Sequence, residues 1–158
     1  MLKQMTSKLS KRTLTGMSLA LAALLLAIQP ALAAGASFTI IVRSAFTMGD
    51  AGVGDDHEID FSTPGVNAGR RAVLMVQTRD VDFTFNGVQI NGTSLQNLVQ
   101  HDTGSDESYV HMIIVPANVL RADQPNTLRL TSRNLDGNLS GNLDDFVVER
   151  VVIHYEVQ

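Results

Sequence analysis

Apolar and polar side chains alternate with a period of two residues along most of the chain, and this pattern constrains the fold more than any other sequence feature. Successive side chains of a β-strand point to opposite faces, so the alternation predicts strands. No stretch of residues 34–158 keeps a helical period over three turns. About eight short strands separated by Gly and Pro predict an all-β fold, an antiparallel β-sandwich or jelly roll. The runs are 37–43, 57–61, 72–78, 81–85, the segment after Gly87, 109–115, 126–133 and 144–157.

Three of these runs carry further information about their place in the fold. Runs 72–78 and 109–115 are apolar on both faces, which is typical of a central strand that is covered on both sides. In the last run the apolar residues change phase between Val148 and Val151. A strand that changes its buried face in midcourse usually carries a bulge, and we expect one at residues 149–150.

The stretch VDFTFNGVQINGTSL (residues 81–95) resembles a β-hairpin. Asn-Gly is the favoured pair for a two-residue type I′ turn, because both positions need a positive φ. The first such pair, Asn86-Gly87, would place Phe85 opposite Val88 across the hairpin. We therefore expect a turn at this pair, with a structural rather than a ligand-binding role.

The first 33 residues have the features of a cleaved, helical signal peptide. Four basic residues precede an apolar run from Met17 to Ile28, and small residues occupy positions 31 and 33. A membrane-spanning helix needs about 20 apolar residues, so this run favours a cleaved signal over the alternative, an uncleaved anchor. We expect a signal peptide at 1–33, a single domain at 34–158, no membrane span after cleavage, and a secreted or periplasmic location.

The charge of the mature chain limits its partners. Removal of residues 1–33 leaves eight arginines, no lysine and 16 acidic residues, a formal charge of −8. Such an acidic chain is poorly suited to nucleic acid or to anionic membrane surfaces. The chain also lacks cysteine, so a secreted domain of this sequence must rely on a buried core or a bound metal rather than on disulfides.

The order of motifs between residues 81 and 134 is similar to that of a known superfamily. After FNGVQINGTSL comes a polar loop and then YVHMIIVPANVLRADQPNTLRLTSRN, and the chain ends in DDFVVERVVIHYE. These segments resemble the galactose-binding-domain-like jelly rolls, of the carbohydrate-binding-module type. The glycine usual in that family before Asn126 is replaced here by ADQP, which alters only the turn. The resemblance implies a β-sandwich and a role in carbohydrate binding or adhesion. The matching positions are Ile114, Val115, Pro116, Leu120, Asn126, Leu128 and Leu130.

Acidic side chains gather in two regions that are far apart in the sequence. Asp55 and Asp56 belong to a glycine-rich acidic segment at 49–60, and Asp144 and Asp145 precede the last strand run. Calcium prefers six to eight oxygen ligands, which flexible acidic loops can supply. In a sandwich whose first and last strands pair, the two regions could converge. The four aspartates are therefore candidate calcium ligands, and the alternative is that they are solvated loop carboxylates.

Polar loops supply candidate ligand-binding residues for a sugar. Asn, Asp and Arg commonly bond sugar hydroxyls, and a tyrosine ring can act as a stacking platform. The candidates are His101, Asp102, Tyr109, Arg133 and Asn134. The absence of Trp counts against a high-affinity glycan site. No Gly-x-Ser-x-Gly elbow, cysteine nucleophile or glutamate pair is present, so we expect no enzymatic activity.

Two functional hypotheses follow. The first is a secreted, non-catalytic module that binds extracellular or cell-envelope carbohydrate, with calcium as a candidate stabilising ion. The alternative is a structural or adhesive surface protein that acts through protein–protein association, including association with itself as an oligomer. Runs 72–78 and 147–157 would then supply an apolar association face.

Overall fold

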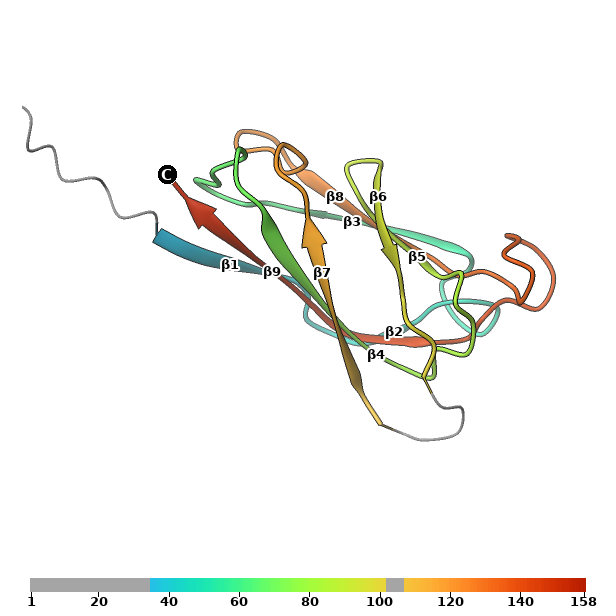
Figure 1. Ribbon diagram of the computed structural model, residues 1–158. Coiled ribbons are helices and arrows are strands. Elements are labelled where there is room, and N and C mark those ends of the chain that lie inside the picture. The colour runs from blue at the N-terminus through green and yellow to red at the C-terminus, as the bar shows by residue number, and fades with distance from the viewer. Residues whose placement is uncertain (1–34, 102–106) are drawn as a thin grey trace, which may run out of the picture. The chain divides into compact units, whose positions relative to one another are not determined.

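The computed structural model describes residues 35–101 and 107–158, which form an all-β sandwich of two antiparallel sheets (Figure 1). This part of the chain contains nine strands, one more than the alternation predicts. The predicted signal peptide at 1–33 and the candidate residue Asp102 lie outside the described residues. Within the described ranges, no helix is long and apolar enough to cross a membrane.

The larger sheet contains five strands. Strand β9 lies between β1 and β4, and β7 pairs with the other side of β4, while the short β2 pairs with the first part of β9. All of these pairs are antiparallel. The bounds are β1 Gly35–Val42, β2 Phe46–Thr47, β4 Ala72–Arg79, β7 Tyr109–Val115 and β9 Val147–Val157.

The smaller sheet contains four strands in the order β3, β8, β5, β6, again antiparallel. Its first strand begins within the glycine-rich acidic segment, and its two central strands, β8 and β5, are paired on both sides. The bounds are β3 Asp56–Phe61, β5 Gly87–Ile90, β6 Thr93–Asn97 and β8 Asn126–Thr131.

The core lies between the two sheets and is built from alternate residues of each strand. On β4, for example, the side chains of Leu74 and Val76 are completely buried, whereas those between them point outward. Burial of such side chains is the main favourable contribution to folding. Asn126, at the start of β8, supports one end of the core. Its amide oxygen accepts from the Arg121 N–H (2.8 Å) and its amide nitrogen donates to the Arg121 carbonyl (3.2 Å).

The predicted change of phase in the last strand is confirmed. On β9, Arg150 pairs with Gln77 and Val148 pairs with the next residue, Thr78, so Glu149 is the additional residue of a bulge. The bulge allows Val148 before it and Val151 after it to be completely buried in the same core.

The predicted turn at Asn86-Gly87 is wrong. Residues 81–86 form no strand, and the hairpin connects β5 to β6 through Asn91 and Gly92, whose φ angles are 51° and 78°. Asn86 is instead fully buried. Its amide nitrogen bonds the carboxylate of Asp144. This long-range bond places the turn at the second Asn-Gly pair, five residues after the position that the local pattern favours.

The expectation that β4 and β7 are covered on both sides is also wrong for the described residues. Their inner faces are buried in the core, but Val110, Met112 and Ile114 on the outer face of β7 are 52–66% exposed. Strand β7 is an edge strand of the larger sheet, not a central one (Figure 1). The outer face of the larger sheet is therefore apolar and open to solvent in this chain.

Candidate functional site

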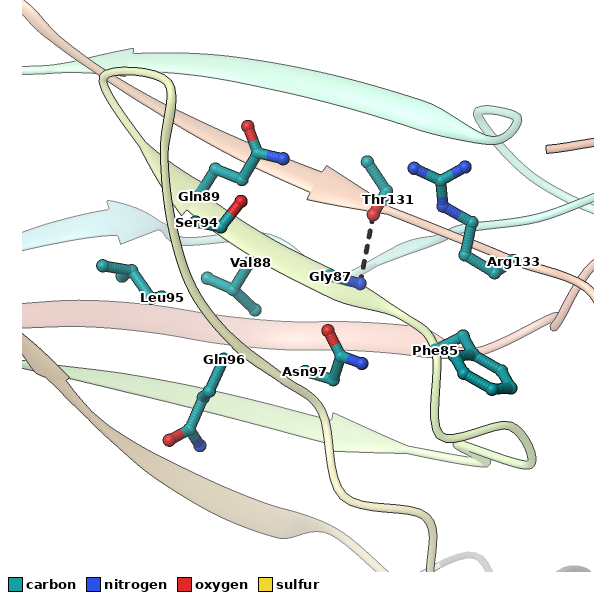
Figure 2. A pocket seen from close by; sticks show the side chains of 10 residues that line it. All are labelled: Phe85, Gly87, Val88, Gln89, Ser94, Leu95, Gln96, Asn97, Thr131 and Arg133. Carbon is teal, nitrogen blue, oxygen red and sulfur yellow. Dashed lines mark hydrogen bonds between the residues drawn. The ribbon is translucent and has the colours of Figure 1, made fainter. Parts of the chain in front are cut away.

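A cleft on the outer side of the smaller sheet gathers the polar groups best suited to bind a ligand. It has a volume of about 260 Å³ and lies over β5 and β6. Figure 2 shows the Phe85 ring and the Arg133 guanidinium group at one end, with the side chains of Gln89 and Ser94 at the other. The lining residues are Phe85, Gly87, Val88, Gln89, Ser94, Leu95, Gln96, Asn97, Thr131 and Arg133.

Phe85 presents an aromatic ring to this cleft because the chain turns before β5. The residue lies in a turn that ends at the buried Asn86, and 48% of Phe85 is exposed. A neighbouring loop contacts the ring: a Cβ atom added to Gly137 would lie 3.3 Å from Phe85 Cγ. Gly137 also has a φ of 80°, which favours glycine. The ring is thus held against the loop while it remains partly open to solvent.

Backbone hydrogen bonds fix the positions of Thr131 and Arg133 at the end of β8. The Gly87 N–H donates to Thr131 Oγ1 (3.0 Å), which is the bond drawn in Figure 2. The Arg133 N–H donates to Asn86 Oδ1 (2.9 Å). Because Asn86 is also bonded to Asp144, one buried amide positions both Phe85, its neighbour in sequence, and Arg133.

A second cavity of about 260 Å³ continues along the same sheet and shares Gln89 with the first. It contains charged groups from β3 and β8. Arg129 forms a bidentate ion pair with Asp56 and lies 3.9 Å from a carboxylate oxygen of Glu58. The bond from Arg129 holds the pKa of Asp56 below its usual range. The outer side of the smaller sheet is therefore polar over much of its length.

The candidate sugar ligand Asn134 closes a loop and does not point freely into the cleft. Its amide nitrogen donates to the Ser140 carbonyl (2.7 Å). Its amide oxygen accepts from the N–H groups of Asp136 (3.0 Å) and Asn138 (2.8 Å). The loop closed in this way contains Gly137, which contacts Phe85. Asn134 is thus a positioning residue for the aromatic ring.

The candidates His101 and Tyr109 lie together, in a separate groove beside β7. Their rings stack with centroids 3.9 Å apart, so one face of Tyr109 is covered by the histidine. The groove has a volume of about 440 Å³. Gln96 lines both this groove and the Phe85 cleft, so the two lie on either side of β6. The other lining residues are Val99, Gln100, Val110, His111 and Met112.

Burial favours the neutral form of both histidines of this groove. His111 accepts a bond from the Val99 N–H at Nδ1 (3.4 Å), which leaves the proton on Nε2 to donate to Thr78 Oγ1 (2.9 Å). Burial lowers the pKa of His111, and nearby His101 lowers it further. Burial also lowers the pKa of His101. Its Nε2 atom is buried and has no hydrogen-bond partner within residues 35–101 and 107–158.

The two acidic regions do lie next to each other. Their carboxylates, however, hold the loops together through hydrogen bonds. The Leu143 N–H donates to Asp50 Oδ2 (3.0 Å), and the Ala51 N–H donates to Asp145 Oδ1 (2.8 Å). Asp55 contributes its backbone carbonyl, which accepts from the Ser132 N–H (2.9 Å). The carboxylates thus bond backbone N–H groups across the contact.

The surroundings of Asp144 indicate a structural role for its carboxylate. The residue is 2% exposed, and its carboxylate accepts bonds from the N–H groups of Asp82 (3.1 Å) and Phe83 (2.9 Å) and from the Asn86 amide. Burial raises the pKa of Asp144, and the bonds from Phe83, Asn86 and Asp82 act in the opposite direction. Its oxygens are therefore already engaged by donors of the chain.

The four candidate calcium ligands have different partners in the structure. Asp56 pairs with Arg129, Asp144 is buried, and Asp145 bonds a loop N–H. Among residues 35–101 and 107–158, no three His, Asp or Glu side chains gather closely enough to hold a metal ion. The residues as placed do not form a ligand set, and calcium binding stays a prediction.

Sequence reasoning missed most of the cleft. It placed Phe85 opposite Val88 in a hairpin, and it did not single out Gln89, Ser94 or Thr131. Of the four predicted ligand residues that lie in the described part of the chain, only Arg133 lines the Phe85 cleft. The second Asn-Gly pair, at 91–92, is the sequence signal that could have predicted the correct turn and, with it, an exposed Phe85 ring.

No protein-family model and no curated protein matches the sequence. Among solved structures, the chain is similar to the CBM36-1 domain of a multidomain xylanase from the hindgut metagenome of Trinervitermes trinervoides. The TM-score is 0.43 and the sequence identity 8%, over 76% of this chain and 96% of that domain. The β-sandwich predicted from the sequence is confirmed.

Proposed function

We propose that the chain is a secreted, non-catalytic module that binds extracellular or cell-envelope carbohydrate in the Phe85 cleft. One observation carries the proposal: a partly exposed aromatic ring and an arginine lie at one end of an open cleft that is also lined by neutral amide and hydroxyl groups. The cleft is small compared with pockets that enclose a drug-sized ligand, which hold roughly 300–1,000 Å³. It therefore suits a sugar unit contacted on one side, within a longer chain.

The chemistry of the lining groups matches that of a sugar. A pyranose has an apolar face of C–H groups, which packs on an aromatic ring, and a rim of hydroxyls that both donate and accept. Gln89 supplies a donor and an acceptor, Ser94 a hydroxyl, and Arg133 a planar set of donors. Phe85 replaces Tyr109 as the proposed platform, because Tyr109 is already stacked on His101.

A direct test compares two exposed phenylalanines, one in the cleft and one on the larger sheet. Phe85 is 48% exposed in the cleft and Phe38 is 60% exposed on the larger sheet. Binding of soluble oligosaccharides from a broad panel is measured by calorimetry with protein produced from the full sequence. Phe85→Ala should weaken binding about fivefold, since stacking contributes about 1 kcal/mol. Phe38→Ala should leave the dissociation constant unchanged.

Arg133→Ala tests the polar part of the same cleft. Loss of its charged donors should raise the dissociation constant about tenfold or more. The fold should persist, because the Arg133 bond to Asn86 is made by the backbone N–H. A folded protein that binds no glycan in the panel, or equal effects of Phe85→Ala and Phe38→Ala, would contradict the proposal.

Calcium is tested separately by a thermal melt in EDTA and in millimolar calcium. An ion that binds only the folded state stabilises it by about 2.7 kcal/mol at a hundred times its dissociation constant, and so raises the melting temperature. An unchanged melt would remove calcium from the proposal and leave the carbohydrate cleft intact, since no aspartate lines it.

A further inference from the structure

The outer side of the larger sheet carries a continuous set of apolar side chains from four strands, here called the apolar face. Phe38, Val110, Met112 and Ile114 are 60%, 52%, 66% and 54% exposed, and the other members are half-buried. The members of the apolar face are Phe38 and Ile40 of β1, Val152 of β9, Val73 and Met75 of β4, and Val110, Met112 and Ile114 of β7.

The strand register places these side chains next to one another. Ile40 pairs with Val152, Val152 with Met75, and Met75 with Met112, so one apolar row crosses all four strands. A small hollow of about 50 Å³ opens beside this row and is lined by Met75, Gln77, Val110, Arg150 and Val152. An apolar side chain of a partner could fill it. Such rows on an exposed sheet face are typical of an interaction surface.

Charged groups lie mainly toward the two ends of the apolar face, although Arg150 lines the hollow beside the central row and the exposed His154 stands between Phe38 and Val73 in the strand register. Arg70 lies 3.6 Å from Glu156 at one end, and Arg79 lies 3.8 Å from Glu149 at the other. Each end thus carries both signs, and no acidic residue is among the members of the face, although the chain has an excess of acid elsewhere. An apolar centre with a mixed polar rim is the anatomy of a protein–protein interface. Its charges are compatible with those of a second copy in either orientation.

The size of the face is that of a modest interface. Four strands about 4.8 Å apart, over six or seven residues of about 3.3 Å, cover on the order of 400 Å² in plan. Protruding side chains and the rim increase the accessible area toward the roughly 800 Å² per partner of a standard interface. Because one face is open, the outward apolar side chains of β4 are only half-buried and those of β7 are exposed.

We propose that the apolar face packs against the same face of a second copy of this chain, in a two-fold symmetric dimer. A closed symmetric pair uses one self-complementary surface and hides it completely. The packing gives β4 and β7 the second covering layer that their sequence patterns predict. The Phe85 cleft belongs to the other sheet and stays open, so this inference does not depend on the proposed carbohydrate site.

Two exposed apolar residues provide a matched test. Met112 is 66% exposed on the apolar face, and Leu135 is 70% exposed in the loop after β8. Protein produced from the full sequence is analysed by size-exclusion chromatography with light scattering over micromolar to hundreds of micromolar concentrations. The parent protein and Leu135→Lys should have the mass of a dimer. Met112→Lys should raise the dimer dissociation constant at least about tenfold, because it places two like charges in an apolar interface.

Cross-linking gives a second readout that keeps the contact surface intact. The chain has no cysteine, so Met112→Cys and Leu135→Cys each create a single thiol. A short bis-maleimide should couple Met112→Cys into dimers and leave Leu135→Cys monomeric. A parent protein that is monomeric at the highest concentration would overturn the proposal. So would masses that grow beyond a dimer, or a monomer that sediments with neutral lipid vesicles and loses this property in Met112→Lys.

Discussion

At the scale of single residues, two neighbouring aspartates illustrate how burial decides the role of a carboxylate. Asp144 is 2% exposed and accepts bonds from three groups, whereas Asp145 is exposed and bonds one loop N–H. Asp144→Ala leaves the three donors without their partner, so it should lower the free energy of unfolding by about 2–3 kcal/mol. Asp145→Ala should cost less than about 1 kcal/mol. Urea unfolding measures both, and equal losses would contradict the structural role of Asp144.

The buried His111 predicts a loss of stability on mild acidification. In the unfolded chain a histidine takes up a proton near pH 6.5, whereas burial holds the pKa of His111 lower in the folded state. The stability contribution is therefore complete above pH 6.5 and is lost as the pH falls through the folded pKa. The urea midpoint should fall between pH 7.5 and 5.5, and less so in His111→Gln. The exposed His154→Gln serves as the control and should retain the full decrease.

At the scale of strands and turns, the sequence predicts what depends on local pattern and fails where a distant contact decides. Strands β4 and β7 lie where alternation places them, and the β9 bulge lies at Glu149. Two Asn-Gly pairs stand five residues apart, and local rules cannot choose between them. Asp144, which lies 58 residues after Asn86, decides between them, because its carboxylate accepts a bond from the Asn86 side chain. Because the turn was predicted at Asn86-Gly87, Phe85 was not among the predicted ligand-binding residues.

The position of this hairpin can be tested at its glycine. Gly92 has a φ of 78° with no atom near an added Cβ, so Gly92→Ala introduces backbone strain alone. It should cost about 1–2 kcal/mol. Gly69 is also exposed, lies outside the left-handed region, and would place a Cβ 3.5 Å from its nearest neighbour. Gly69→Ala should change stability by less than about 0.5 kcal/mol. Equal urea midpoints for the two variants would argue against a turn at 91–92.

At the scale of the whole sandwich, the two sheets share a core but have opposite outer sides. The smaller sheet presents amides, hydroxyls and ion pairs around Gln89, and the larger presents the apolar face around Met75. The sequence shows the difference between the two outer sides. Runs 72–78 and 109–115, in the larger sheet, are apolar on both faces, whereas run 126–133, in the smaller sheet, alternates. It could not reveal that the second apolar side remains open, because that depends on which strands lie at the edge of each sheet.

If both proposals hold, the dimer has two carbohydrate clefts and should bind a polysaccharide surface multivalently. The second contact then forms within one complex, so binding to an immobilised polysaccharide should be at least about 100-fold tighter than binding to a short oligosaccharide of the same sugar. Surface plasmon resonance on a dense polysaccharide layer and calorimetry with the oligosaccharide measure the two quantities on the same protein.

The variants separate the two contributions to this gain. Met112→Lys should lose most of the additional affinity for the surface and keep the affinity for the oligosaccharide, because it changes the dimer and leaves the cleft unaltered. Phe85→Ala should weaken both. Full retention of the gain in Met112→Lys would show that the apolar face is not its source, and unchanged oligosaccharide binding in Phe85→Ala would place the sugar outside the cleft.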